Sequence, residues 1–267
     1  MSSEMPTFLR RVVDGPAISL VVVIVAVIIW EMAVGLTGVR GFILPAPSAI
    51  AANAWNERAL VAEHTSYTVW GIASGYAVAS IFALAVAMAM IQVPVIERIL
   101  MPIFVALESV PKIAIAPLIL LWIGTGLVSQ LLVIVSVTFF PIVINAVTGF
   151  KNVDRGLINV FRSIKTTRRQ TFFRLQLPYA LPYVFAGLRI ATTLSVLGAI
   201  VAEWLAASRG VGYLILSGSF NFNTARSFTA IIVLAAIGMI FFSAISALER
   251  RFSWRVRQER DATASTK

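Results

Sequence analysis

The sequence contains no cysteine and only one histidine, His64, among its 267 residues. The absence of cysteine excludes a disulfide framework, a thiolate metal site and a thiol nucleophile. A single histidine cannot form a multi-histidine metal cluster. We therefore expect no metal site, no cofactor site and no catalytic residue in this chain. We expect His64 to be an interface residue rather than a metal ligand or an acid–base group.

Charged residues are also scarce. They make up 13% of the chain, whereas hydrophobic residues make up 59% and the mean hydropathy is +0.89. Ordinary soluble domains are about 25% charged and roughly 45–50% apolar. Since one aqueous core could not bury so much apolar surface, the composition predicts a protein that uses lipid as its second solvent.

Six stretches of the chain are long and apolar enough to cross a membrane, which requires about 20 residues. The third stretch contains three prolines, so we expect a broken span there. We predict an all-α integral membrane protein with six transmembrane helices in a single domain, 1–267, with its core at about 60–250, an N-terminal tail and first span at 1–41 and a cytoplasmic tail at 252–267. The six predicted spans are Ala17–Leu36, Tyr67–Ile91, one within Ile99–Ile123, Val128–Val147, Pro182–Ala206 and Ser227–Leu248.

The distribution of positive charge predicts the orientation of these spans. With the N-terminus inside, sixteen Lys and Arg residues fall in cytoplasmic segments and four fall outside. Such a bias is typical of cytoplasmic loops, and it predicts a multi-pass protein of the inner (plasma) membrane with both termini cytoplasmic. It also accounts for the net charge of +10 without a nucleic-acid partner. The inside set comprises Arg10, Arg11, Arg98, seven residues of 151–177 and six from Arg250 onward.

Three connecting segments carry local signals. Ser48 follows a proline-rich turn and is predicted to cap a short interfacial helix that runs through Ala59. The glycine-rich outer segment Ser208–Arg226 predicts a loop with a short re-entrant or surface helix. The small polar residues after Arg260 predict an unstructured end.

The basic segment Lys151–Leu177 contains an amphipathic pattern. Its apolar residues recur at helical spacing, whereas its arginines lie off that stripe. Two interpretations remain open from the residues alone: an interfacial helix held by anionic lipid, or a docking helix for a cytoplasmic partner. Before Pro178 and Pro182 we expect a bend, followed by a new span. The stripe is formed by Leu157, Val160, Phe161 and Ile164, with Arg155, Arg162 and Arg169 outside it.

Charged residues within the apolar runs are expected to face a cavity or a partner, because burying an unpaired charge in lipid is costly. Glu203 could shape a pathway or could reach the outer interface. Glu31 is expected to be an interface residue. Lys112 follows Pro111, where the backbone is broken, and a broken helix at membrane depth is tolerated only against protein or a water cavity. Glu108–Pro117 is therefore a candidate gate element, with Glu203 as a further pathway candidate.

Several motifs resemble one known family in the order in which they occur. Asn159–Pro178 and the following residues to Arg189 look like the "EAA loop" of ABC importer permeases, in the branch of nitrate, sulfonate, taurine and thiamine-precursor importers. Five other regions are similar to that branch: Ser109–Gly124, Phe140–Asn145, Gly198–Glu203, Gly210–Ile215 and Ala247–Arg251. Together they cover most of the chain from about Phe42 to Arg251.

The resemblance implies a type I ABC importer permease fold in which a helix from about Arg155 to Thr171 couples to a cytoplasmic ATPase. It implies as partners a cytoplasmic ABC ATPase dimer, a second copy of the permease or a homologous one, an extracytoplasmic solute-binding protein, and membrane lipid. The chain has no phosphate-binding loop of the G-x-x-x-x-G-K-[ST] type, so ATP would be bound by the partner. The implied coupling residues are Asn159, Phe161, Arg162, Ser163, Lys165, Thr166 and Arg168, and the implied pathway or gate residues are Glu108, Pro111, Lys112 and Glu203.

The sequence departs from the family pattern inside the loop. Where the family has Glu-Ala-Ala and then Gly, this chain has Asn159-Val160-Phe161 and then Lys165. The docking face is therefore expected to be bulkier and more cationic. The family implies a small solute such as a sulfonate, nitrate or a heterocyclic precursor. The alternative is a gradient-driven secondary transporter or channel, which usually shows acidic residues within its spans or an inverted repeat.

Overall fold

The computed structural model describes residues 16–206 and 208–264, with residues 16, 17, 19, 206 and 253–264 described in backbone only. The regular elements of this part of the chain are all helical. They form two compact units. The first contains residues up to 62 together with 214–231, and the second contains 63–213 together with those from 232 onward.

The first unit contains α2 (Pro16–Thr37) and α3 (Pro47–Asn56). α2 confirms the predicted first span, and none of its described side chains from Leu20 to Thr37 is buried within the chain. The prediction that Ser48 caps α3 is wrong, because Ala46 precedes the helix and its side chain makes no capping bond. Instead, the Glu31 carboxylate accepts bonds from the Ser48 amide at 3.0 Å and the Ser48 hydroxyl at 2.7 Å. A side chain of α2 therefore supplies the acceptor that the first turn of α3 requires.

Four further helices confirm predicted spans and extend beyond the predicted bounds. They are α4 (Arg58–Gln92), α7 (Leu127–Lys151), α10 (Leu177–Ala206) and α12 (Thr224–Ala264). Since α12 continues through Ala264, the prediction of an unstructured end after Arg260 is wrong for residues 261–264. The predicted cytoplasmic residues Arg10, Arg11 and Lys267 lie outside the described residues.

The third predicted span is broken, as its prolines indicated. It consists of α5 (Pro94–Glu108), a short 3-10 helix η1 (Lys112–Ile115) and α6 (Ala116–Ile123). The two arms meet at an angle of 86°. Five helices in the described residues are long and apolar enough to cross a membrane, or six if this bent pair counts as one span.

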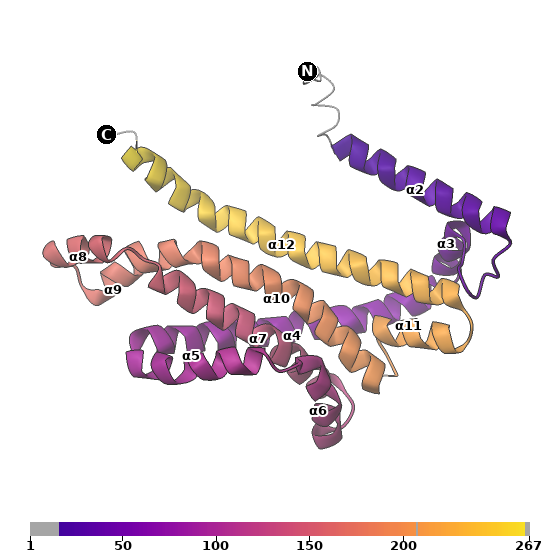
Figure 1. Ribbon diagram of the computed structural model, residues 1–267, viewed down its shortest axis with the longest axis horizontal. Coiled ribbons are helices and arrows are strands. Elements are labelled where there is room, and N and C mark those ends of the chain that lie inside the picture. The colour runs from indigo at the N-terminus through magenta and orange to yellow at the C-terminus, as the bar shows by residue number, and fades with distance from the viewer. Residues whose placement is uncertain (1–15, 207, 265–267) are drawn as a thin grey trace, which may run out of the picture. The chain divides into compact units, whose positions relative to one another are not determined.

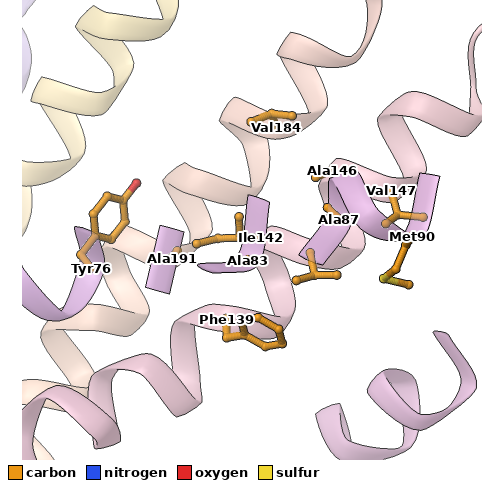
Figure 2. Close-up of a cluster of buried hydrophobic side chains, with 11 residues drawn as sticks. Tyr76, Ala83, Ala87, Met90, Phe139, Ile142, Ala146, Val147, Val184 and Ala191 are labelled. Atoms are coloured by element: carbon orange, nitrogen blue, oxygen red, sulfur yellow. The ribbon is translucent and has the colours of Figure 1, made fainter. Parts of the chain in front are cut away.

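The core of the second unit lies between α4, α7 and α10. α7 and α10 run side by side over most of their length (Figure 1). Figure 2 shows small and aliphatic side chains of the three helices meeting between them. The three helices therefore form one closely packed bundle. The labelled members are Tyr76, Ala83, Ala87 and Met90 from α4, Phe139, Ile142, Ala146 and Val147 from α7, and Val184 and Ala191 from α10.

Two glycines on α4 allow α7 to approach closely. A Cβ at Gly71 would lie 2.7 Å from the side chain of Gln130, and one at Gly75 would lie 2.8 Å from that of Ile134. The G-x-x-x-G pattern in this span therefore serves helix packing within the chain.

The remaining elements are short. They are α8 (Arg155–Ser163), α9 (Arg168–Thr171), the π-helix η2 (Phe172–Gln176) and α11 (Val211–Phe220). α11 confirms the short helix predicted within Ser208–Arg226. The predicted bend before Pro178 is wrong, because the chain stays helical from Arg168 through η2 into α10. A π-helix alters the hydrogen-bond register, and η2 lies directly before Pro178 in this continuous helix.

Candidate functional site: the coupling loop and the Glu203 cluster

The first candidate site is the segment Asp154–Thr171, here called the coupling loop. Its sequence determines where α8 begins, because the Asp154 carboxylate accepts a hydrogen bond of 2.6 Å from the Gly156 amide. A carboxylate at this position satisfies an otherwise unpaired donor and interacts favourably with the helix dipole. α8 is therefore a locally specified helix despite its nine residues.

α8 ends in a tight turn at Lys165. The Thr166 amide donates to the Phe161 carbonyl at 3.2 Å and the Lys165 amide to the Arg162 carbonyl at 3.0 Å. This is the bonding pattern of a Schellman motif, in which the residue after the cap adopts a left-handed conformation and is usually glycine. Lys165 adopts this conformation with φ of 55°. A glycine, which the resembled family has at this position, would adopt this conformation without strain, whereas in this chain a lysine adopts it.

The coupling loop then restarts as α9. Thr167 accepts from the Gln170 amide at 3.2 Å and the Gln170 side chain accepts from the Thr167 amide at 2.9 Å, forming a capping box. The predicted single helix from Arg155 to Thr171 is therefore wrong. The structure has two short helices because the Schellman turn ends the first and the capping box starts the second.

The coupling loop exposes an apolar stripe that the rest of the described chain does not cover. Leu157 is 41% exposed, Val160 56% and Ile164 65%, which confirms the predicted stripe for these residues, whereas Phe161 is half-buried. Asn159, Arg162, Ser163, Lys165 and Arg168 are exposed, and Thr166 is half-buried. Within the described residues no carboxylate pairs with Arg162, Lys165 or Arg168. The surface thus combines uncovered apolar and unpaired cationic groups.

The second candidate site surrounds the Glu203 carboxylate, which is 1% exposed. One oxygen, Oε1, accepts from the Thr68 hydroxyl at 2.7 Å and from Gln130 Nε2 at 2.9 Å. The other, Oε2, accepts from the Gly212 amide at 2.7 Å. Three donors therefore converge on a carboxylate that forms no ion pair among the described residues. The alternative of a side chain at the outer interface is wrong for Glu203.

The same network holds the segment after α10 in place. The Val211 amide donates to the Thr68 hydroxyl at 2.8 Å, and the Gly210 amide donates to His64 Nδ1 at 2.9 Å. Three successive backbone amides, 210 to 212, are thereby bound by α4 and Glu203. Gly210 has φ of +109°, and a Cβ there would lie 2.2 Å from Glu203 Cδ, so only glycine fits this close approach.

His64 belongs to this Glu203 cluster, defined as His64, Thr68, Gln130, Glu203 and the amides 210–212. It is 6% exposed and stacks on Tyr213 with ring centroids 5.7 Å apart. The prediction of an interface histidine is therefore wrong, because its ring accepts a hydrogen bond inside the unit. The sequence contained one signal for this role: His64 and Thr68 lie four residues apart on one helix face.

The predicted gate element Glu108–Pro117 lies at the bend between α5 and α6. Glu108 ends α5 and Pro111 precedes η1, so both flank the 86° bend. Lys112 Nζ donates to the Glu108 carbonyl at 3.0 Å and lies 5.4 Å from the centroid of the Phe140 ring. None of Glu108, Pro111 and Lys112 is a hydrogen-bond partner of Glu203. The structure therefore divides the four predicted pathway residues between two places.

Comparison with known proteins decides the family. The model of the family "Binding-protein-dependent transport system inner membrane component" matches residues 79–254. The chain belongs to this family. This permease resembles the formylaminopyrimidine transport permease protein ThiX of Halalkalibacterium halodurans, with 34% identity over 86% of the chain and 93% of the relative. It also resembles the riboflavin transport system permease protein RibX of Chloroflexus aurantiacus, with 34% identity over 89% and 90%.

A third relative is the putative aliphatic sulfonates transport permease protein SsuC of Bacillus subtilis, with 32% identity over 86% of the permease and 85% of the relative. Among solved structures, a chain of the MetNI methionine ABC transporter in inward-facing conformations matches with a TM-score of 0.63 and 17% identity, covering 74% of the permease and 98% of that chain. These matches confirm the predicted importer permease fold.

Membership of this family establishes the class of protein, its membrane and the kind of partners it has. The protein is a multi-pass permease subunit of an ABC importer in the inner membrane, and it is not the catalytic subunit. A binding-protein-dependent system requires an ATPase and a solute-binding protein as partners. The alternative of a gradient-driven transporter or channel is thereby excluded.

Proposed function

We propose that the coupling loop docks this permease onto a cytoplasmic ATPase and transmits the ATPase motion to the membrane helices. The observation that carries the proposal is the uncovered stripe of Leu157, Val160 and Ile164 beside unpaired cations on a firmly capped helix. An apolar face of this kind is stabilised by insertion into a partner's groove. The proposed contact residues are Asn159, Phe161, Arg162, Ser163, Lys165, Thr166 and Arg168.

Charge reversal of Arg162, Lys165 and Arg168 to Glu tests the docking role. We expect the ATPase to be lost from gently solubilised complexes and uptake to stop, while the permease still inserts into the membrane. A matched triple reversal of Arg174, Arg250 and Arg251, which lie outside the coupling loop, should retain the ATPase. Normal ATPase binding and uptake in the first variant would refute the assignment.

We propose further that both termini face the cytoplasm, so that the coupling loop is inside and residues 208–226 are outside. The positive-inside bias supports this orientation. Because the chain has no cysteine, single cysteines at Ser163 and Ser208 would report it directly. A membrane-impermeant thiol reagent applied to intact cells should label Ser208→Cys and leave Ser163→Cys unlabelled. The opposite pattern would overturn the orientation and the docking role together.

The proposed solute is a small organic compound, with a nitrogen heterocycle preferred over a sulfonate or nitrate. The support is that both relatives described above at 34% identity are named for heterocycles, formylaminopyrimidine and riboflavin. The test is uptake of labelled formylaminopyrimidine, riboflavin, an alkanesulfonate and nitrate by cells with and without the intact transporter. Uptake of the sulfonate or nitrate alone would overturn the preference.

We also propose that two permease subunits, identical or homologous, form the pathway, and that the bend at Pro111 and the Glu203 cluster act as gate elements. A helix break at membrane depth is tolerated only where it lines a cavity or a protein contact, and a gate would lie at such a place. Replacing Pro111 with Ala should straighten the bend and reduce uptake while ATPase binding persists. Unchanged uptake would remove Glu108, Pro111 and Lys112 from the gate. The size of the purified complex reports the number of permease subunits.

A further inference from the structure

A cleft of about 910 Å³ lies between the end of α4 and the coupling loop. Its walls come from three places in the second unit: the last turn of α4, the inner side of α8, and the run from α9 into η2. Its size is that of a cavity able to hold a small molecule or a lipid headgroup. The lining residues are Met88, Ile91, Gln92, Ile158, Arg162, Thr166, Arg168, Arg169, Thr171, Phe172, Phe173 and Gln176.

The charge of the cleft has one sign. Arg162, Arg168 and Arg169 line it, and no Asp or Glu does. Among the described residues no carboxylate pairs with these three guanidinium groups, although that of Arg169 lies 5.8 Å from the centroid of the Phe173 ring. Since guanidinium groups match phosphate oxygens in a bidentate geometry, the lining is suited to a phosphate group.

The depth of the cleft indicates the source of that phosphate. The apolar span of α4 stops at Gln92, and the apolar span that contains α10 begins at Arg168. The arginines therefore lie at the end of membrane-spanning helices, beside the apolar side chains of Met88, Ile91 and Phe172. Basic pockets between spans at this level recognise anionic lipid headgroups. A free phosphate ion would make no contact with the apolar wall.

We infer that the cleft binds the headgroup of an anionic phospholipid, with its phosphate on the three arginines and its acyl chains directed along the apolar wall. The inference goes beyond the proposed docking role. The coupling loop would then contact a partner through its exposed apolar stripe and the inner leaflet through the cleft, with Arg162, Thr166 and Arg168 at the border of the two surfaces. Both interpretations that the amphipathic pattern left open would hold, one for the stripe and one for the cleft.

The test uses the purified permease with its ATPase, exchanged into phosphatidylglycerol or phosphatidylcholine and examined by native mass spectrometry. Arg169 is the residue to change, because it lines the cleft but is not among the proposed docking residues. We expect wild type to retain phosphatidylglycerol in preference to phosphatidylcholine and Arg169→Gln to bind it about tenfold more weakly. Arg169→Lys, which keeps the charge, should recover part of the affinity.

Arg174→Gln is the matched control, since it removes the same charge from the same segment outside the cleft, and it should leave lipid binding unchanged.

Three results would overturn the inference. Equal retention of both lipids would exclude a headgroup site, and displacement of phosphatidylglycerol by millimolar inorganic phosphate would indicate a small-anion site. Loss of the ATPase from Arg169→Gln with unchanged lipid binding would assign the cleft to the ATPase interface. The variant of Arg162, Lys165 and Arg168 also removes two arginines of the cleft, so the lipid site is judged on Arg169→Gln with ATPase binding retained.

Discussion

The coupling loop and the Glu203 cluster lie in the same unit but satisfy their polar groups in opposite ways. Glu203 is 1% exposed and all of its described bonds are made within the chain. The coupling loop satisfies its backbone by caps, yet leaves Val160 and Ile164 more than half exposed and its arginines without a carboxylate partner among the described residues. The donors around Glu203 find their acceptor within the chain and stabilise the fold, although Gln130 Oε1 has no partner among the described residues. A surface that the described residues leave uncovered is suited to a partner.

This comparison predicts where substitutions will act. Changes in the Glu203 cluster should lower the stability of the permease, because they leave buried donors without acceptors. Changes in the coupling loop should leave stability nearly unchanged and alter assembly instead. An exposed side chain contributes little to folding unless it holds the backbone.

The largest effect is expected for Glu203→Leu. It removes the acceptor of Thr68, Gln130 and the Gly212 amide, and each buried donor left unsatisfied costs about 1–3 kcal/mol. We expect the free energy of unfolding to fall by about 3 kcal/mol or more, measured by thermal unfolding of the solubilised protein. Glu63→Leu, on the same helix α4 but exposed, is the control. Equal unfolding of both variants would show that the cluster does not support the fold.

A smaller loss is expected for Gly210→Ala. The new Cβ would lie 2.2 Å from Glu203 Cδ, and the φ of +109° is unfavourable for alanine. We expect a loss of roughly 2 kcal/mol by the same measurement. Gly35→Ala is the matched control, because a Cβ added there would meet no other atom within 4 Å and alanine favours a helix. A neutral Gly210→Ala would show that the segment 208–212 moves freely away from Glu203.

In the coupling loop, Lys165→Gly should raise stability rather than lower it. A left-handed conformation costs a non-glycine residue about 1 kcal/mol, and glycine would relieve this cost at the end of α8. Lys165→Ala removes the same charge but keeps the Cβ. The difference in stability between the two variants therefore measures the cost of the left-handed backbone conformation. We expect Gly to exceed Ala by about 1 kcal/mol in thermal unfolding. If both variants lose the ATPase equally, the lysine charge is what the partner recognises.

Much of the fold was predictable from the sequence. Apolar length specified the spans, because lipid requires a continuous apolar surface of fixed length. The prolines before and after Glu108 indicated the broken third span. The stripe of Leu157, Val160 and Ile164 was predicted from spacing alone, since it depends only on helical periodicity.

The sequence could not show which polar residues meet. Thr68, Gln130 and Glu203 are far apart in the chain, and their contact depends on how α4, α7 and α10 pack. Local signals were also overridden. Ser48 resembles a cap, but the Glu31 carboxylate reaches α3 from another helix. Lys165 gave no sign of a turn, because the bonds that end α8 are made by backbone groups.

The smallest effect is expected for the ion pair of Arg226 and Glu57. Its exposure lies between that of Glu203 and that of the coupling loop. Arg226 Nε donates to Glu57 Oε2 at 2.7 Å, and the side chains are 23% and 21% exposed. The hydrogen bond from Arg226 lowers the pKa of Glu57 below its usual 4.5. Because the folded-state pKa is the lower one, the pair stabilises the permease above about pH 4.5, and this contribution is lost as the pH falls through the folded-state pKa.

We therefore expect Glu57→Gln to unfold more easily than wild type at pH 7, by about 1 kcal/mol or less, and the difference to shrink below about pH 4.5. Arg226→Gln, which removes the cause of the pKa shift, should flatten the acid dependence in the same way. Thermal unfolding between pH 3.5 and pH 7 measures both variants. A difference that persists unchanged at low pH would mean that packing around Glu57, rather than its charge, stabilises this mostly buried pair.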